Sequence, residues 1–267
     1  MSIVAVISDL HVGSTTAIAP PTFRIHVRER TEAQQVEANR LQQWLYGCWQ
    51  DYWHYVFGLA KQHRVQVHIF LLGDTIDGNL TRHAQTIPEV EDQISIAVEL
   101  LEPIVHRCAS VTGVIGTAFH AGDAGGNEIR VYQQIGAEGY GQHLSRKVDG
   151  KVHDLAHHGR SGQREWTSQA ASMATTMALD YVHQGLAPPD YVWRGHNHLI
   201  DDSGTKLMGT RAIACPSWEL RTEYGWHKGQ TRSDIGGFLV VDGLLDDSHC
   251  RYRGSPDSLE VIDLDRK

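Results

Sequence analysis

Short motifs of histidine and aspartate, each placed after a hydrophobic run, constrain this chain more than any other feature. They are Asp9-Leu10-His11, Gly73-Asp74, His157-His158 and Gly195-His196-Asn197-His198. Each preceding run is typical of a buried β-strand, so we expect each motif at the carboxyl end of a strand. In open α/β sheets, ligands bind at that edge. The pattern therefore predicts an α/β protein with these motifs gathered at one edge.

Hydrophobic periodicity predicts strands and helices along the whole chain. Apolar runs predict strands over 3–7, 65–72, 111–115, 191–193, 207–214 and 237–242, and one more near the C-terminus. Asp149-Gly150 predicts a tight hairpin turn between strands 144–148 and 152–156.

The predicted helices lie between these strands, after an extended loop over residues 13–30. A capping box at Thr31 and Gln34 predicts the start of a long helix that breaks near Gly47. Further helices are predicted over 88–108, 126–138 and 167–185. No repeat or linker-like tract occurs, which predicts one domain over residues 1–267.

Composition excludes some classes of protein. The 267 residues carry a formal net charge of −8 and no run of Lys or Arg, unlike a dedicated duplex-DNA binder. Bound divalent ions would offset negative charge, so a phosphate substrate stays compatible with this balance. The four cysteines form no Cys-x-x-Cys pair, which is typical of free thiols in a reducing compartment. The N-terminal apolar run is too short for a signal peptide or membrane span, so we expect a cytoplasmic protein without a membrane partner.

The motif side chains are the ligand types of a site for two divalent metal ions. Asp9 and His11 stand two residues apart and so project to one side of an extended chain, as do His196 and His198. Asp74 supplies a carboxylate that can bridge two ions. Mixed carboxylate and imidazole ligation suits Mn, Fe or Zn better than Ca. Two ions about 3.5–4 Å apart can hold a bridging hydroxide as nucleophile and clamp phosphate oxygens, so no Ser or Cys nucleophile is needed.

This order of motifs resembles the calcineurin-like metallophosphoesterase family. The resemblance covers residues 1 to about 215, and the matching residues are Asp9, His11, Gly73, Asp74, Asp77, His157, Gly195, His196 and His198. It implies a four-layer α/β/β/α sandwich of two mixed β-sheets flanked by helices. It also implies a metal-dependent phosphoesterase, a phosphodiesterase or phosphatase that hydrolyses phosphoric esters at a dinuclear site.

The resemblance also implies a role for each ligand. Asp9, His11 and His198 would hold one ion, His157 and His196 would hold the other, and Asp74 would bridge them. Asp77 is predicted to be a turn or supporting residue. His158 should point away from His157 in a strand, so for His158 a supporting role and no role are both open.

The loop after the third strand departs from the family pattern. The family usually has Gly-Asn-His-Asp/Glu there, whereas residues 116–120 read Gly-Thr-Ala-Phe-His, similar to phage-type members. Thr117 stands where the Asn is expected. We expect His120 to belong to the site, either as a metal ligand or as a general acid, and to be catalytic together with Asp74. Asn127 is a weaker source of an amide ligand.

Residues 216–235 are aromatic and charged without periodicity. They are either a packed surface loop or a lid that contacts substrate. Arg221 could pair with a phosphate, and Trp218 and Tyr224 could stack on a base, so these three are the predicted substrate-binding residues.

Three functions follow from these patterns. The leading one is hydrolysis of a phosphomonoester or phosphodiester, and the acidic charge favours a small substrate such as a nucleotide over a nucleic acid. A nuclease that acts on DNA or RNA is the second. A catalytically silent scaffold of the same fold is the third, although the ligand motifs are largely intact. The aromatic stripe of the long first helix leaves a homo-oligomer open.

Overall fold

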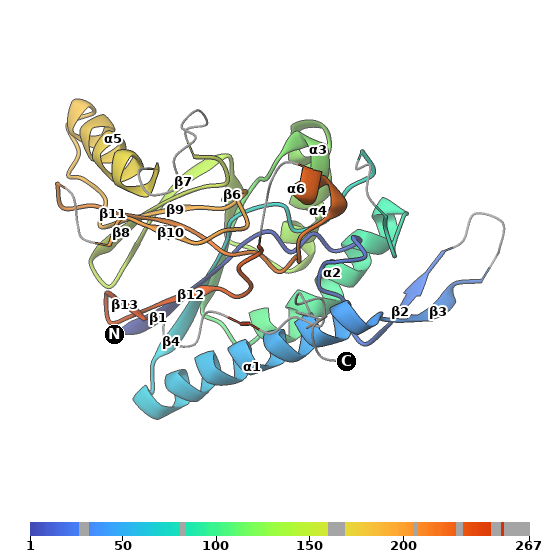
Figure 1. The fold of residues 1–267 in the computed structure, drawn as a ribbon. Coiled ribbons are helices and arrows are strands. Elements are labelled where there is room, and N and C mark those ends of the chain that lie inside the picture. Colours follow the sequence, from blue (N-terminus) through green and yellow to red (C-terminus); the bar gives the residue numbers. More distant parts are fainter. Residues whose placement is uncertain are drawn as a thin grey trace, which may run out of the picture.

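Two mixed β-sheets form the centre of the fold and carry helices on their outer faces (Figure 1). The computed structural model describes residues 1–26, 32–80, 84–159, 169–204, 208–227, 232–246 and 252–253. A strand precedes each of the predicted motifs. The arrangement of these strands therefore determines where the motifs lie relative to one another.

The first sheet has six strands in the order β13-β12-β1-β4-β5-β6. β1 pairs with β12 in the antiparallel sense, β12 pairs with β13 in the same way, and the four strands from β1 to β6 are parallel. The central strands are buried, as expected of parallel strands covered on both faces. The strands are β1 (Ser2–Ile7), β4 (Gln66–Leu71), β5 (Ser110–Val114), β6 (Gly139–Gly141), β12 (Phe238–Val241) and β13 (Leu244–Asp246).

The second sheet has five strands in the order β10-β11-β9-β8-β7. β8, β9 and β11 are parallel, and β7 forms the predicted hairpin with β8. Asp149 and Gly150 at its turn have φ values of 47° and 79°, as a type I′ turn requires. The strands are β7 (His143–Val148), β8 (Lys151–Ala156), β9 (Tyr191–Arg194), β10 (Asp201–Asp202) and β11 (Arg211–Ala214).

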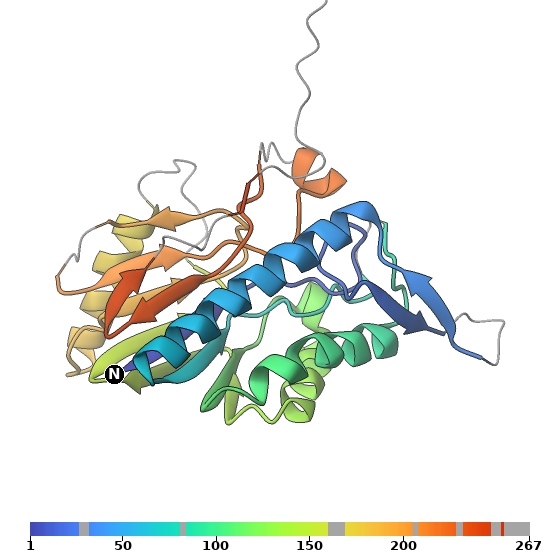
Figure 2. The same cartoon turned by 90° about the horizontal axis from the view of Figure 1, so that it is seen from below.

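Helices complete the four layers that the resemblance implies. α1 (Arg40–His63) runs along β1 and β4 on the outer side of the first sheet, with α2 (Val90–Val105) and α4 (Gly126–Gln134) packed on each other beside it (Figure 2). α5 (Gln169–His183) covers the second sheet. Short turns of helix occur at α3 (Ala118–Ala121), η1 (Asp123–Gly125) and α6 (Glu223–His227). Among the described helices, none has the length and apolar character needed to cross a bilayer.

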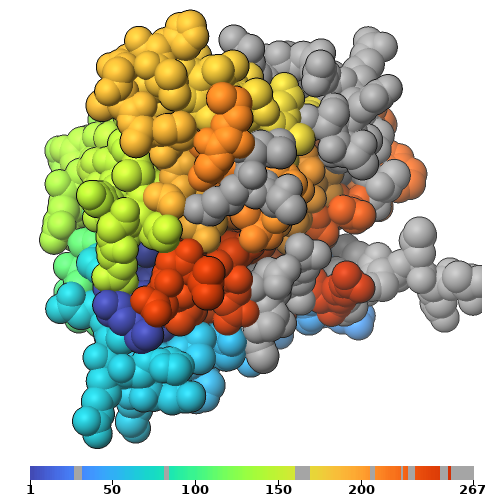
Figure 3. Space-filling model, turned by 90° about the vertical axis from the view of Figure 1, so that its left-hand side faces the viewer, coloured from blue at the N-terminus to red at the C-terminus, as the bar shows by residue number. Residues whose placement is uncertain are grey.

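The two sheets pack face to face through large buried side chains. The ring of Trp193 on β9 lies 6.0 Å from that of Phe238 on β12, and the ring of His153 on β8 lies 5.3 Å from that of Phe70 on β4. Trp193, Phe238 and Phe70 are essentially fully buried, and each contributes about 1.5–3 kcal/mol. One core therefore runs through both sheets, although the single domain over residues 1–267 stays a prediction. Figure 3 views the molecule from the end where β1 begins, with α5 and the β7–β8 hairpin at the surface.

The start of the first helix is predicted wrongly. α1 begins at Arg40, because Asn39 accepts hydrogen bonds from the amides of Leu41 and Gln42 and forms a capping box with Gln42. Residues 34–37 instead form β3 (Gln34–Glu37), which pairs with β2 (Thr22–Ile25) in a projecting hairpin where an extended loop is predicted (Figure 1). Thr31 lies outside the described residues.

The predicted break near Gly47 is also wrong. α1 is one helix of 24 residues, and its buried face includes Leu45 before Gly47 and Trp49 after it. A glycine inside a helix costs only about 1 kcal/mol relative to alanine. Burial of the aromatic face exceeds that cost, so the helix continues.

A buried carboxylate, Asp154 on β8, supports the second sheet. It accepts hydrogen bonds from His143 Nε2 at 2.6 Å and from the Tyr181 hydroxyl at 2.9 Å, and Arg194 Nη2 lies 2.8 Å from its Oδ1 atom. Burial by itself would raise the pKa of Asp154, but the hydrogen bond from His143 and the charge of Arg194 outweigh burial and lower that pKa. The carboxylate is therefore ionised in the folded protein.

We expect Asp154→Asn to lower the free energy of unfolding by about 3–5 kcal/mol at pH 7, because Arg194 is only 5% exposed and would lose its partner. Since the pKa of Asp154 is lower in the folded state, its stabilisation is present above the ordinary carboxyl pKa and is lost as the pH falls through the folded value. Urea unfolding curves from pH 7 to acid should therefore converge for the two proteins. Asp180→Asn, on the exposed side of α5, is the control and should change stability by less than about 0.5 kcal/mol. Parallel pH curves would contradict this assignment.

Candidate metal centre

Six strand ends meet at one place between the two sheets. β1, β4 and β5 are parallel in the first sheet, and β8, β9 and β11 are parallel in the second, so the carboxyl ends of each set share an edge. The polar side chains that follow these strands and lie close together are Asp9, His11, Asp74, Asp77, His120, His157, His158, His196, His198 and Glu219.

The backbone of the site is unusual in its conformation. Five of its residues have positive φ: Asp9 at 53°, His11 at 45°, Asp74 at 49°, His196 at 74° and His198 at 55°. Left-handed backbone is uncommon for residues other than glycine. It persists only where the surroundings impose it, and such residues cluster at functional sites.

The loops after β4 and β5 approach each other closely. A Cβ atom added to Gly73, whose φ is 91°, would lie 2.7 Å from the Cα atom of Gly116. Glu128 of α4 joins the same two loops, because its carboxylate accepts hydrogen bonds from the amides of Thr75 at 2.8 Å and Gly116 at 2.6 Å. Burial of Glu128, together with the charge of Asp74, raises the pKa of the Glu128 carboxyl. Sequence reasoning missed this residue.

The first group of ligand atoms fits one metal ion. The Nε2 atoms of His11 and His198 lie 3.1 Å apart, and Asp9 Oδ1 lies 3.7 Å and 3.4 Å from them. Metal–ligand bonds of about 2.0–2.2 Å separate neighbouring ligand atoms by about 3–3.5 Å. The backbone of Asp9 is also held, because its carbonyl accepts a hydrogen bond from the Trp218 amide at 3.0 Å.

Two buried carboxylates border this group. Glu219 Oε2 lies 3.8 Å from His11 Nε2 and 3.7 Å from His198 Nδ1, and Asp77 Oδ1 lies 3.6 Å from His11 Nδ1. Asp77 therefore lies beside the ring of His11, and its supporting role stays a prediction. Glu219 was missed, although the rule that found the other ligands could have found it: it stands five residues past the predicted strand 207–214.

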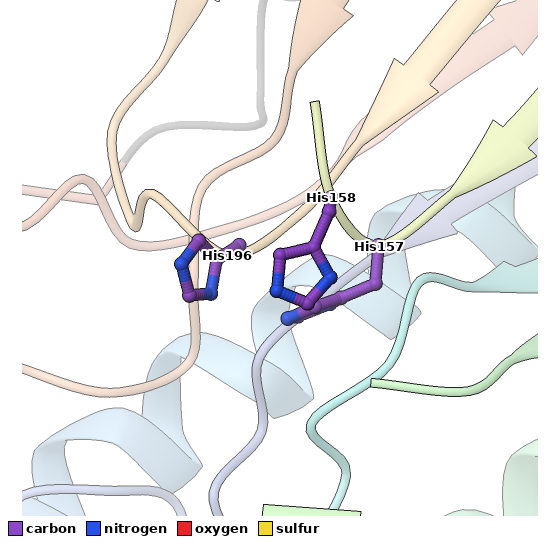
Figure 4. Close-up of side chains that lie close together, drawn as sticks. All are labelled: His157, His158 and His196. Carbon is purple, nitrogen blue, oxygen red and sulfur yellow. The ribbon is translucent and has the colours of Figure 1, made fainter. Parts of the chain in front are cut away.

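The second group lies on the other side of Asp74. His157 Nδ1 lies 2.6 Å from the Leu72 carbonyl oxygen, which can only accept, so Nδ1 donates and Nε2 is the ring atom that could bind a metal ion. This Nε2 atom is buried without a hydrogen-bond partner among the described residues, and it faces Asp74 Oδ2 at 3.0 Å. The ligand nitrogens of His157, His158 and His196 lie within 4.8 Å of one another (Figure 4). These three imidazoles could therefore hold a metal ion, and Asp74 lies beside His157 at the edge of this group.

The charges of the site also suit a cation. Burial opposes ionisation of Asp9, but hydrogen bonds to His11 and His198 keep the pKa of that carboxyl well below its usual range. Burial would lower the pKa of His157, yet Asp74 raises it to about 9, whereas burial and the charge of His157 lower the pKa of His196 to about 4. A metal ion bound here would displace the proton of His157, since imidazole ligands bind in the neutral form.

His120 lies on the side of the first group. Its Nδ1 atom donates to the Asp77 carbonyl oxygen at 2.7 Å, and its ring centroid is 4.4 Å from that of His11. Thr117 donates its amide, at 2.7 Å, and its hydroxyl, at 3.1 Å, to Asp74 Oδ1, so it orients the shared carboxylate. The amide of Asn127, the weaker alternative, lies against Gly122.

The predicted substrate-binding residues lie in different surroundings. Trp218 is fully buried against Trp49, with ring centroids 4.8 Å apart, so its predicted contact with substrate is wrong: apolar packing holds the ring in the core. The guanidinium of Arg221 lies 4.2 Å from the centre of the Trp226 ring, and its contact with a phosphate stays a prediction. The side chain of Tyr224 lies outside the described residues.

Comparisons with known proteins find distant likeness in structure only. No model of a known protein family matches the chain, and no curated protein matches it significantly. The chain is similar to YfcE, a phosphoesterase from E. coli, at 14% identity over 90% of this chain and 88% of that one, with a TM-score of 0.42. A novel archaeal phosphodiesterase is similar at 10% identity over 90% and 93%, with a TM-score of 0.41. The zinc complex of Vps29 from Entamoeba histolytica is similar at 13% identity over 90% and 85%, also with a TM-score of 0.41.

We expect Glu128→Ala to lower the free energy of unfolding of the metal-free protein by about 2–6 kcal/mol. Two buried amides would lose their acceptor, and each loss costs about 1–3 kcal/mol. Glu128→Gln should cost less, because its single carbonyl oxygen can still serve one amide. Urea denaturation measures both, with Glu102→Ala on the exposed face of α2 as the control. Equal stability of the Glu128 and Glu102 variants would show that Glu128 does not hold the two loops.

Proposed function

We propose that this protein is a metal-dependent hydrolase of phosphoric esters, a phosphodiesterase or phosphatase that uses two divalent ions. The observation that carries this proposal is the position of Asp74. Its carboxylate lies within 4.8 Å of ligand atoms of Asp9 and His11, which belong to the first position, and of His157, which belongs to the second. A carboxylate between two such groups can hold both ions at the separation that phosphate chemistry needs.

The proposed ligands are those that the motifs predict. Asp9, His11 and His198 hold the first ion, His157 and His196 hold the second, and Asp74 belongs to both. The ions supply Lewis acidity and lower the pKa of water, and the mixed ligand set suits Mn, Fe or Zn.

The residues around these ligands fix their orientation. Thr117 holds Asp74 Oδ1, which leaves Oδ2 toward His157, and the Leu72 carbonyl holds the ring of His157. Such outer hydrogen bonds set the tautomer and direction of a ligand. The site therefore needs little rearrangement to accept ions and the oxygens of a phosphate.

His120 is the group of the site that can bind an ion or move a proton. Its Nδ1 atom is engaged by the Asp77 carbonyl, so Nε2 is the atom available for either role. Burial and the charge of His11 lower the pKa of His120. Both roles, metal ligand and general acid, stay open for this atom.

An activity assay tests the proposal directly. The protein is stripped with a chelator, reconstituted with Mn²⁺, Fe²⁺ or Zn²⁺, and assayed with bis-p-nitrophenyl phosphate, p-nitrophenyl phosphate and single-stranded DNA. Elemental analysis should give two ions per chain, and hydrolysis should need them. Preference for DNA would indicate the nuclease. Two bound ions with no hydrolysis of any substrate would favour the scaffold and contradict the proposal.

We expect Asp74→Ala and His196→Ala each to abolish hydrolysis and to reduce the number of bound ions, because each removes a ligand. His63→Ala, at the exposed end of α1, is the control and should keep full activity and metal content. Elemental analysis and steady-state rates with bis-p-nitrophenyl phosphate measure both effects. Comparable activity in all three variants would mean that the site is elsewhere.

The role of His120 predicts two different outcomes for His120→Ala. If His120 is a ligand, metal content and rate should fall together. If it is a general acid, metal content should hold while kcat falls by about 10²–10⁴ for substrates with poor leaving groups. Esters of p-nitrophenol should then be spared, since that leaving group needs no proton. Unchanged metal content and unchanged rates on both kinds of substrate would show that His120 is structural.

A further inference from the structure

We infer that His158 completes the second metal position, so that three imidazoles, those of His157, His158 and His196, bind there. This inference rests on the proposed function, and it concerns how the site departs from the motif. It assigns a ligand role to a residue that an extended strand would point away from the site.

Among the described residues, the loop after β5 contributes no side chain to the cluster of His157, His158 and His196. Thr117, which stands where an Asn is expected, uses both its amide and its hydroxyl to donate to Asp74. His120 shares its group of ligand atoms with His11 and Asp74, not with His157. Neither residue therefore supplies the second position.

His158 lies where its ring can join those of His157 and His196. β8 ends at Ala156, so the alternation of an extended strand no longer applies and both following histidines can turn toward the same point. The ring centroid of His158 lies 4.9 Å from that of His157 and 4.6 Å from that of His196 (Figure 4). Rings at this spacing with ligand nitrogens within 4.8 Å of one another can converge on one ion.

The consequence is that the two positions differ in chemistry. The first has Asp9 as a ligand and two further carboxylates, Asp77 and Glu219, beside it. The second would have the neutral imidazoles of His157, His158 and His196, and its one carboxylate, that of Asp74, would also bind the first ion. Carboxylate ligands suit Mn²⁺, whereas imidazole ligands suit Zn²⁺. A given site generally binds Zn²⁺ more tightly than Mn²⁺, so we expect this preference to be larger at the second position than at the first and to depend on His158.

Calorimetric titration of the metal-free full chain with Zn²⁺ and, separately, with Mn²⁺, combined with elemental analysis, tests this inference. The unmodified protein should bind two ions. His158→Phe keeps an aromatic ring but has no lone pair, so one ion should bind at least about tenfold more weakly while the other is unchanged. His158→Asn supplies an amide ligand and should bind that ion with intermediate affinity. His183→Phe, the same change at an exposed histidine of α5, is the matched control and should bind both ions normally.

The outcomes separate this inference from the proposed function. If the unmodified protein binds no Zn²⁺ or Mn²⁺, the proposed function itself fails. If it binds two ions and both His158 variants bind them with unchanged affinity, only the inference about His158 is overturned. Selective weakening of one ion in His158→Phe, with partial recovery in His158→Asn, supports it.

Discussion

The carboxylate of Asp74, buried where the two sheets meet, is the constraint on which the site depends. An ionised carboxylate in such a place is costly unless charge or hydrogen bonds compensate it. Thr117 donates to this carboxylate and His157 faces its Oδ2 atom, so both sheets contribute to its surroundings. Glu128 holds the two loops that make these contacts. The close approach of those loops in turn requires glycine at position 73, where a side chain would strike the neighbouring backbone.

The sequence was sufficient to predict that those candidate ligands that stand directly after strong strand signals lie together. Asp9, Asp74 and His157 each follow an apolar run, and parallel pairing then brings their strand ends together without further information. The positions of Glu219 and His158 were harder to predict from the sequence. The first stands beyond a short irregular segment, and the second departs from the alternation of a strand because the strand has already ended. Their positions depend on how the chain turns after the sheet, which periodicity does not describe.

Competition between local signals explains the other errors. Two capping-box patterns occur before the first helix, and the one at Asn39 starts it because the aromatic face follows directly from there. Trp218 belongs to a segment without periodicity, so no pattern predicted that its side chain is buried. Its aromatic ring alone suggested stacking on a substrate. In the structure the indole ring of Trp218 packs on Trp49. The backbone amide of Trp218 donates a hydrogen bond to the carbonyl oxygen of Asp9. It supports the site from the core side.

The distance along the chain between the ligands has a consequence for folding. His11 and His198, whose ring nitrogens lie 3.1 Å apart, are separated by 187 positions in the sequence. An ion held by both would act as a cross-link that closes most of the chain into a loop. Such a link restricts the unfolded ensemble, much as a long-range disulfide does, and this restriction grows slowly with loop length. Metal binding would therefore join the first and last thirds of the molecule and oppose separation of the two sheets.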